Sequence, residues 1–143
     1  VVMERTNARL LKEADFPERP SLCVMDVSFI SIRLILPALA PIVGESGRFV
    51  TLVKPQFEAG RERVGKKGVV REEGVHLQVL GELHAFVEGM GWRVSAADFS
   101  PVTGPEGNIE FLFCLTHALH TPSFLGPQEL AEIVVNAHKT LGR

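Results

Sequence analysis

The segment that most constrains the fold of this chain is residues 49–67, in which an apolar run stops at a lysine followed by a proline. Residues 49–53 are apolar or β-branched, a composition typical of a buried strand. Pro55 has no backbone N–H and cannot continue a β-ladder, so we expect the strand to end at Lys54. Ligands of open α/β sheets bind at the carboxyl edge of the strands. The pattern therefore predicts that the Lys54 amine faces a ligand site.

Strand and helix patterns alternate on both sides of this segment. Short apolar runs indicate strands at residues 1–4, 22–25, 48–53, 92–99 and 109–116. Helical spacing indicates a segment at 29–39 that Ser28 caps, a helix at 72–90, and a last helix that begins at Pro127. This order predicts an α/β fold with a mostly parallel sheet buried on both faces. The two last strands have no long helix between them, so they can pair as an antiparallel ribbon, which adds one antiparallel strand to the sheet.

Three ionisable residues stand where the predicted strands meet one edge of the sheet. Asp26 ends one strand, Lys54 ends the next, and Glu110 lies near the start of the antiparallel one. An antiparallel strand starts at the edge where its parallel neighbours end, so the three side chains can meet. Two interpretations stay open from the residues alone: a structural ion-pair cluster, or a catalytic centre at the ligand edge.

A glycine-rich basic loop follows Lys54. Gly60, Gly65 and Lys66 imitate a phosphate-binding P-loop, but Lys67 stands where a magnesium-binding Ser or Thr is required, so we exclude a nucleotide triphosphatase. The charge and reach of the loop suit an RNA backbone better. The alternative is a solvated surface loop, because glutamates dilute the charge. The candidate RNA-binding residues are Arg61, Arg63, Lys66, Lys67 and Arg71.

Bulk composition limits the class of protein. The 143 residues suffice for one domain, and the net charge of −2 gives no global signal for nucleic acid. Cys23 and Cys114 lie in apolar runs, as buried free thiols do, which favours a reducing cytoplasm. Apolar stretches are too short to span a membrane, so we expect no membrane partner. The chain opens without an initiator methionine in a strand-like run, so we expect a piece that begins within a domain.

The histidines do not predict a metal site. His117 and His120 have a suitable spacing but no third ligand nearby, so we interpret them as a pair at a strand end and loop. His76 and His84 fall on the predicted 72–90 helix, and we expect them on its surface.

Several long motifs resemble one known family. Residues 4–9 (ERTNAR), 25–31 (MDVSFIS), 52–61 (LVKPQFEAGR), 64–71 (VGKKGVVR) and 100–112 (SPVTGPEGNIEFL) are similar to the hemolysin-A-like, or TlyA-type, family. Its members are FtsJ-like ribosomal RNA 2′-O-methyltransferases that use S-adenosylmethionine. The resemblance runs through nearly the whole chain. It implies a Rossmann-like methyltransferase sheet, mostly parallel with one antiparallel strand, whose N-terminal part is missing.

The resemblance also implies roles for named residues. The family's catalytic set is Lys-Asp-Lys-Glu, and its last three members fall on Asp26, Lys54 and Glu110, while the first lysine is expected upstream of Val1. Thr6, Asn7 and Asp26 are the candidate contacts to S-adenosylmethionine. The resemblance implies that the glycine-rich strand-turn that cradles the cofactor and the S4-type RNA-binding domain are not contained in residues 1–143. Residues 1–143 are therefore expected to be a partial methyltransferase domain that is inactive alone.

Methyl transfer to a ribose hydroxyl requires alignment and removal of a proton. Lysine is ordinarily protonated, with a pKa of about 10.4, so it serves as a base only where its neutral form is favoured. We assign Lys54 as the base or the hydroxyl-orienting group, and Asp26 and Glu110 as its positioners. The expected partner is ribosomal RNA or a ribosomal subunit, with a homodimer left open. Two alternatives remain: a non-catalytic RNA-binding or dimerising module, and a hemolytic, membrane-active protein, which no amphipathic basic helix supports.

Overall fold

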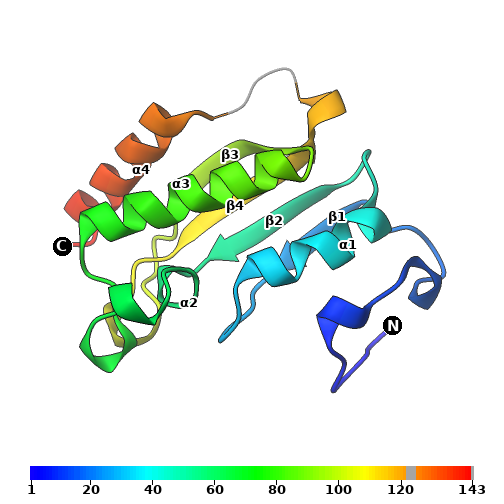
Figure 1. Ribbon diagram of the computed structural model, residues 1–143, viewed down its shortest axis with the longest axis horizontal. Coiled ribbons are helices and arrows are strands. Elements are labelled where there is room, and N and C mark those ends of the chain that lie inside the picture. Colours follow the sequence, from blue (N-terminus) through cyan, green and yellow to red (C-terminus); the bar gives the residue numbers. More distant parts are fainter. Residues whose placement is uncertain (122–124, 143) are drawn as a thin grey trace.

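A computed structural model describes residues 1–121 and 125–142 of the chain. The described residues form one four-stranded sheet in the order β1-β2-β4-β3 (Figure 1). Its strands are β1 (Leu22–Met25), β2 (Arg48–Val53), β3 (Trp92–Phe99) and β4 (Phe111–His117). Three of these strands have the bounds that the sequence predicts, and β4 begins two residues later than expected.

The pairing of the strands corrects the prediction of a mostly parallel sheet. β1 pairs with β2 in parallel, whereas β4 is antiparallel to both β2 and β3. β1, β2 and β3 all run in one direction, as predicted, but β4 is inserted between β2 and β3. A single reversed strand in that place makes two of the three pairings antiparallel. The fold class, α/β, is as predicted.

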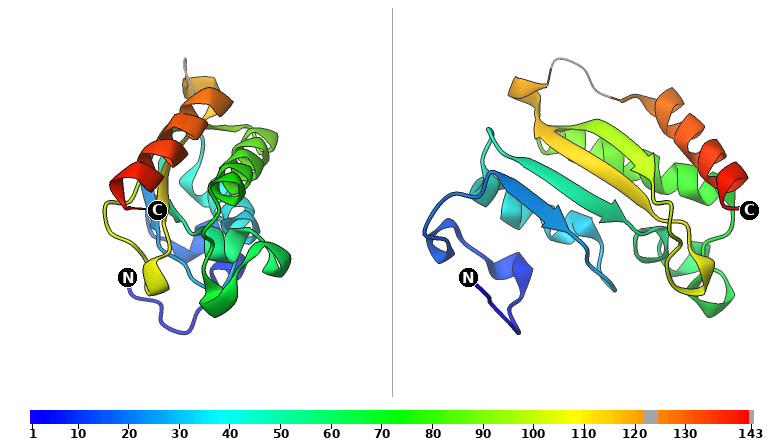
Figure 2. Two further views of the ribbon diagram at one scale, coloured as in Figure 1. Left: turned by 90° about the vertical axis from the view of Figure 1, so that its left-hand side faces the viewer. Right: turned by 180° about the vertical axis from the view of Figure 1, so that it is seen from behind.

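The helices α1 (Leu36–Val43) and α3 (Glu73–Gly89) cover one face of the sheet, whereas α4 (Pro127–Thr140) packs beside α3 and β3 (Figure 2). The rear view in Figure 2 shows the strands uncovered on the opposite face. The apolar side chains of Leu22 and Val24 are accordingly 50% and 71% exposed. The expectation of a sheet buried on both faces is therefore wrong for this chain, because both covering helices lie on the same side.

The core lies between the sheet and these helices. α3 contributes a stripe of apolar side chains, as its 3.6-residue period predicts, and this stripe packs on fully buried residues of β2 and β4. The buried members are Val79, Leu80, Leu83 and Val87 from α3, and Phe49, Val53, Phe111, Phe113 and Leu115 from the sheet. This packing holds β2 and β4 side by side. It therefore also fixes the segment that follows β2 and the segment that precedes β4, which lie at the same edge of the sheet.

The segment before α1 differs from its prediction. A 3-10 turn, η3 (Ile32–Leu34), precedes α1, and its N-cap is Ser31, whose side chain accepts a hydrogen bond from the Arg33 N–H. Ser28 is thus not the cap that we expected. Pro37 lies in the first turn of α1, where a missing N–H is tolerated, and so it marks the start of this helix.

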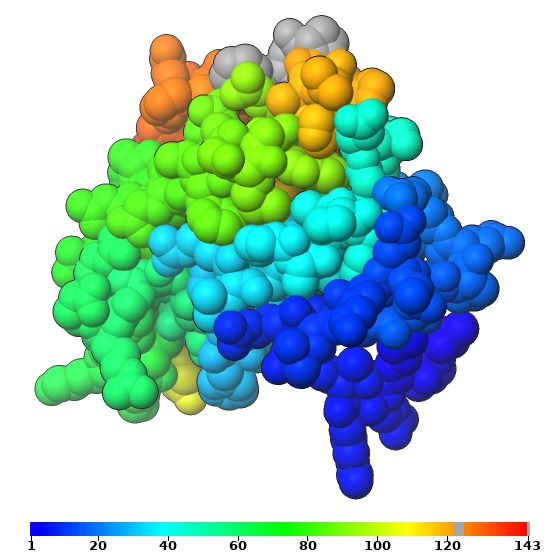
Figure 3. Space-filling view, turned by 45° about the vertical axis from the view of Figure 1, so that its right-hand side comes forward, coloured from blue at the N-terminus to red at the C-terminus, as the bar shows by residue number. Residues whose placement is uncertain are grey.

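The N-terminal residues form no strand, contrary to the expectation for residues 1–4, and Val1 and Val2 are 96% and 86% exposed. The segment continues through η1 (Ala8–Leu10), which packs against α1, and η2 (Glu13–Asp15). Figure 3 shows it as an outer layer beside α1. A strand needs a neighbour to satisfy its backbone, and these residues have none in the sheet. Among the described residues, no helix has both the length and the apolar character to span a membrane.

Candidate active site at the carboxyl edge of β1 and β2

The fold brings Lys54 and Asp26 into contact. Asp26 follows β1 and Lys54 follows β2, and the parallel pairing of these strands places their ends together. Lys54 Nζ lies 2.5 Å from Asp26 Oδ1 and donates a hydrogen bond to Ser28 Oγ at 3.2 Å. The Lys54 side chain is only 12% exposed, whereas that of Asp26 is 66% exposed. The pair therefore has a partly shielded cation and a carboxylate open to a ligand.

Glu110 lies at the same edge but has other contacts. The last pair of the β2–β4 ladder joins Val53 to Phe111, so Glu110 precedes β4 just where Lys54 follows β2. Its buried carboxylate accepts a hydrogen bond from Gln56 Nε2 at 3.4 Å. A side chain at Gly104 would collide with the same carboxylate, so the 100–107 loop also packs against it. Among the described residues, Asp26 is the carboxylate that contacts Lys54.

A cleft opens beside this pair. It has a volume of about 560 Å³ and is lined by Phe29, Gln56, Phe57, Gly60, Arg61 and Val64. Phe29 is 90% exposed, and its ring centroid lies 5.0 Å from that of Phe57. The backbone of Phe29 has a φ of 65°, a left-handed conformation that costs a non-glycine residue about 1–3 kcal/mol and that clusters at functional sites. The cleft thus presents an aromatic wall to solvent.

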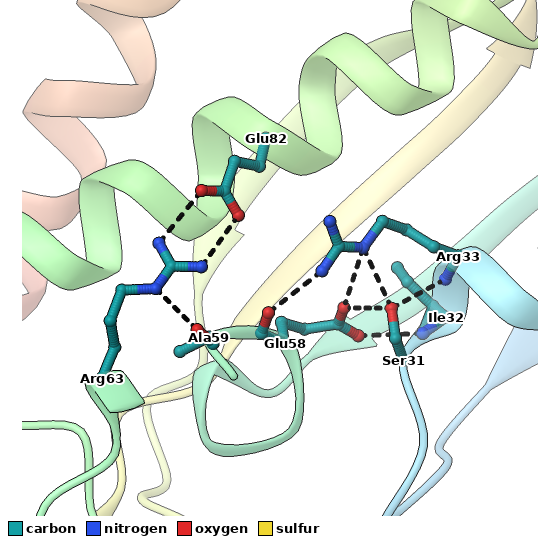
Figure 4. Close-up of polar contacts among 7 residues, drawn as sticks. All are labelled: Ser31, Ile32, Arg33, Glu58, Ala59, Arg63 and Glu82. Atoms are coloured by element: carbon teal, nitrogen blue, oxygen red, sulfur yellow. Dashed lines mark hydrogen bonds and ion pairs between the residues drawn. The ribbon is translucent and has the colours of Figure 1, made fainter. Parts of the chain in front are cut away.

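Glu58 is a polar residue of this region that the sequence analysis did not single out. It ends the short helix α2 (Pro55–Glu58) and is 4% exposed. Its carboxylate accepts hydrogen bonds from Ser31 Oγ at 2.5 Å and from the Ile32 N–H at 2.9 Å (Figure 4). Burial raises the pKa of Glu58, while these two hydrogen bonds and the charge of Arg33 act in the opposite direction.

The basic loop is anchored to α3 by Arg63. Its guanidinium donates two hydrogen bonds to Glu82, at 3.0 and 3.1 Å, and a third to the carbonyl oxygen of Ala59 at 2.6 Å (Figure 4). The hydrogen bond to Glu82 raises the pKa of Arg63, and the same hydrogen bond lowers the pKa of Glu82. Of the five candidate RNA-binding residues, Arg63 is therefore engaged within the fold, whereas Arg61, Lys66, Lys67 and Arg71 are exposed.

We expect Arg63→Ala to lower the free energy of unfolding by up to about 1 kcal/mol, because Glu82 is 42% exposed and solvent screens the pair. The folded-state pKa of Glu82 is lowered, so the pair stabilises the fold above the ordinary pKa of the carboxyl, and this stabilisation is lost as pH falls through the folded value. Denaturant unfolding at pH 7 and at pH 3 measures the difference. Arg61→Ala, at an exposed position, is the control. Equal effects of the two variants at both pH values would contradict the anchor.

The residues expected near the cofactor are only partly placed to bind it. Asp26 stands at the carboxyl edge of β1, where a cofactor carbon or hydroxyl could approach its exposed carboxylate. Asn7 caps η1 through a hydrogen bond from the Arg9 N–H, and the Thr6 hydroxyl donates to the carbonyl oxygen of Glu4. Both side chains are exposed and make local contacts. Of the three expected contacts, Asp26 therefore has an exposed carboxylate at the sheet edge, whereas Thr6 and Asn7 form no enclosing cradle for S-adenosylmethionine.

The histidines differ from their predicted positions in two cases. His76 is fully buried, and its Nδ1 lies 2.8 Å from Nε2 of His138 in α4. His84 is also largely shielded and lies 2.6 Å from the carbonyl oxygen of Leu125. Both face α4 or the segment before it, which the helical period alone does not reveal. His117 and His120 lie at the end of β4 and in the turn after it, as predicted. No cluster of three metal-ligating residues occurs within 1–121 and 125–142.

Comparison with known proteins identifies relatives over nearly the whole chain. Residues 1–117 match the family described as "FtsJ-like methyltransferase". The Bacillus subtilis protein named "Putative rRNA methyltransferase YqxC" is 47% identical over 148 residues, which cover 99% of this chain and 51% of that protein. The "16S/23S rRNA (cytidine-2'-O)-methyltransferase TlyA" of Mycobacterium tuberculosis is 39% identical over 115 residues, 80% of this chain and 43% of that protein. The chain spans about half the length of these curated relatives.

A solved structure agrees with these relationships. The protein described as "Putative hemolysin from Streptococcus thermophilus" superposes with a TM-score of 0.91 at 47% identity, and the match covers 98% of this chain and 50% of that one. Identity at this level, together with a shared fold, establishes common descent. The chain therefore belongs to the FtsJ-like methyltransferase family, and within it the chain is similar to proteins named TlyA and hemolysin.

Proposed function

We propose that the full-length gene product that contains this chain transfers a methyl group from S-adenosylmethionine to a ribose 2′-hydroxyl of ribosomal RNA, in the cytoplasm. The observation that carries the proposal is the Lys54–Asp26 contact at the carboxyl edge of the sheet, beside a cleft with an aromatic wall. The family and the names of the relatives support the same chemistry.

The residues of the chain would act on the ribose hydroxyl. Bound S-adenosylmethionine would supply the methyl group. Lys54 would orient the 2′-hydroxyl by a hydrogen bond, and in its neutral form the amine would receive the hydroxyl proton as the oxygen–carbon bond forms. Asp26 and Ser28 fix the direction of the Lys54 amine, since both contact it. Correct alignment of reacting groups supplies roughly 7–11 kcal/mol in well-oriented systems, so this fixed geometry is expected to account for much of the rate. Glu110 would position Lys54 indirectly, by accepting a hydrogen bond from Gln56 in the α2 turn that follows Lys54.

The cleft would receive the nucleotide next to that hydroxyl. An exposed aromatic ring stacks on a nucleobase, and such stacking contributes about 1–3 kcal/mol per base. Phe29 is exposed, and it lies three residues after Asp26. Arg61 lines the same cleft and can contact a phosphate. The exposed loop residues Lys66, Lys67 and Arg71 would extend this contact along the RNA backbone.

We expect the double variant Lys66→Ala/Lys67→Ala to weaken RNA binding and to flatten its dependence on salt. Each lost phosphate contact removes roughly 0.7–0.9 from the slope of log K against log salt, so two lost contacts remove about 1.4–1.8. Filter binding of ribosomal RNA over a range of salt concentrations measures the slope. Lys12→Ala/Lys139→Ala removes the same charge from exposed positions elsewhere and is the control. If both double variants keep the original slope, the loop is only a solvated surface.

The reaction itself is tested with the full-length protein, radiolabelled S-adenosylmethionine and unmodified ribosomal subunits. A 2′-O-methyl group protects the following phosphodiester from alkali, so the label is expected in alkali-resistant dinucleotides. Label in alkali-sensitive mononucleotides would indicate methylation of a base and would contradict the proposal.

A further inference from the structure

Two sets of contacts join the segment that follows β1 to the segment that follows β2. One is at the surface, where Lys54 contacts Asp26 and Ser28. The other is buried, where Glu58 contacts the turn that Ser31 caps. Both sets connect the same two segments, and the proposed function uses only the first. The buried set therefore requires its own explanation.

Glu58 holds this turn with its side chain and its backbone. One carboxylate oxygen accepts from Ser31 Oγ at 2.5 Å and the other accepts from the Ile32 N–H at 2.9 Å. Arg33 Nη2 donates to the backbone carbonyl oxygen of Glu58 at 3.1 Å, and Arg33 Nε lies 3.8 Å from the carboxylate. Figure 4 shows that Ser31, Ile32 and Arg33, which belong to one turn, all reach Glu58. Such multiple, charge-assisted contacts fix orientation as well as distance.

A buried carboxylate is an expensive way to stabilise a fold. Apolar groups of similar volume often serve stability equally well, because they avoid the desolvation of the charge. What the carboxylate provides is a directional acceptor for two donors at once. The carboxylate therefore serves a group whose position depends on the two segments that Glu58 connects.

That group is Lys54. It immediately precedes Pro55, the first residue of the single helical turn that Glu58 ends, so the α2 turn connects the two residues rigidly. Asp26 and Ser28 lie on the other segment, within five residues of Ser31. Asp26 is largely exposed, so its contact with Lys54 alone is open to competition from water. The buried Glu58 contacts are protected from that competition.

We propose that Glu58 is a positioning residue, which holds Lys54 against Asp26 and Ser28 by locking the α2 turn onto the Ser31–Arg33 turn. This inference rests on the proposed function for its effect on the rate. Glu58 is 4% exposed and is not among the residues that line the cleft. It therefore acts through Lys54 and does not touch the substrate.

The first test measures the position of Lys54 without any reaction. The amines of the full-length protein are labelled briefly with acetic anhydride, and mass spectrometry compares the rates at individual lysines. In Glu58→Ala, labelling of Lys54 is expected to rise several-fold, because the partly shielded amine is released, while Lys66 and Lys67 keep their rates. Lys66 and Lys67 are already exposed and control for the reagent, and denaturant unfolding of the same variant measures any general destabilisation. Unchanged labelling of Lys54 would overturn the inference, whatever the enzyme's activity.

The second test measures the rate. Misplacement of a reacting group by about 1 Å can cost about 100-fold, so single-turnover methyl transfer by Glu58→Ala is expected to fall by roughly 30- to 100-fold while RNA affinity stays unchanged. Glu58→Gln should recover most of the rate, because its amide oxygen still accepts from Ile32. A loss of RNA affinity with an unchanged single-turnover rate would contradict positioning. Released Lys54 with an unchanged rate would instead contradict the role of Lys54 in the proposed function.

Ser31→Ala covers the case in which Glu58→Ala does not fold. It removes the hydroxyl that donates to Glu58 and that caps the Arg33 N–H, and it leaves the Ile32 N–H contact. The expected changes in labelling and rate have the same direction and a smaller size. Ser46→Ala, at an exposed turn position, is its matched control, and equal behaviour of the two serine variants would overturn the inference.

Discussion

Lys54→Ala is expected to lower the rate of methyl transfer by the full-length protein by at least about 10³-fold, because the variant loses both the alignment of the hydroxyl and the group that takes its proton. Lys54 is 12% exposed and contacts Asp26 and Ser28, so its amine is held in a fixed position, unlike the exposed lysines of the basic loop. RNA affinity should change by only a few-fold, since the exposed basic loop supplies the phosphate contacts. Single-turnover methyl transfer and filter binding on the same preparation separate the two quantities.

Two further variants test whether the loss of methyl-transfer rate in Lys54→Ala is specific to this residue and to its contact with Asp26. Lys12→Ala removes a lysine from an exposed position near the N-terminus and should retain the full rate. Asp26→Asn keeps the size of the Asp26 side chain and removes the charge that orients Lys54, so its rate should lie between those of Lys54→Ala and the unmodified protein. A Lys54→Ala variant with a near-normal single-turnover rate would remove this residue from the mechanism.

The four strands and the helices α3 and α4 could be predicted from the sequence because each has a strong local signal, whereas the strand expected at residues 1–4 does not form. β2 is an alternating run that ends before Pro55, and α3 has a continuous 3.6-residue apolar stripe. The order of the strands is not local. Nothing in the residues of β4 reveals that it inserts between β2 and β3, because that choice depends on packing across the sheet. The open face of β1 escapes prediction for the same reason, since an apolar run looks alike whether one face or both are covered.

The candidate site was predictable to the extent that it depends on strand ends. Asp26 and Lys54 each follow a strand, and parallel pairing alone brings them together. The partners of Arg63 and Glu58 were not predictable, because both contacts join segments far apart in sequence. A signal for Glu58 did exist: it is a carboxylate in a short apolar segment directly after Lys54. The sequence of the basic loop likewise does not distinguish Arg63, which anchors the loop to α3, from the cations that are exposed in the structure.

The buried position of His76 shows the same limit on a helix. The period of α3 places this residue on the side of the apolar stripe, but its polarity favours a surface assignment. The structure resolves the conflict by pairing His76 with His138 of α4 and stacking its ring edge-to-face with Phe111. A buried histidine is acceptable when another element supplies a polar partner. That partner lies 62 positions along the chain, beyond the reach of a local pattern.

The 143-residue chain by itself is expected to bind S-adenosylmethionine with a dissociation constant weaker than about 1 mM and to transfer no methyl groups. Asp26 is largely exposed, Thr6 and Asn7 are occupied with local hydrogen bonds, and Leu22 and Val24 leave the β1 face uncovered. A cofactor held on one side gains too little contact to offset its lost freedom. Isothermal titration of the chain and of the full-length protein, for which we expect micromolar affinity, measures the contrast, and circular dichroism checks that the chain is folded.

Two results would change this interpretation. A micromolar dissociation constant for the folded chain would show that its own residues complete the cofactor site, and the one-sided placement at Asp26 would be wrong. Weak cofactor binding by the full-length protein, with RNA affinity retained, would instead favour a non-catalytic RNA-binding module. Such a module has no need of an aligned amine, so Lys54→Ala would then leave every measured property unchanged.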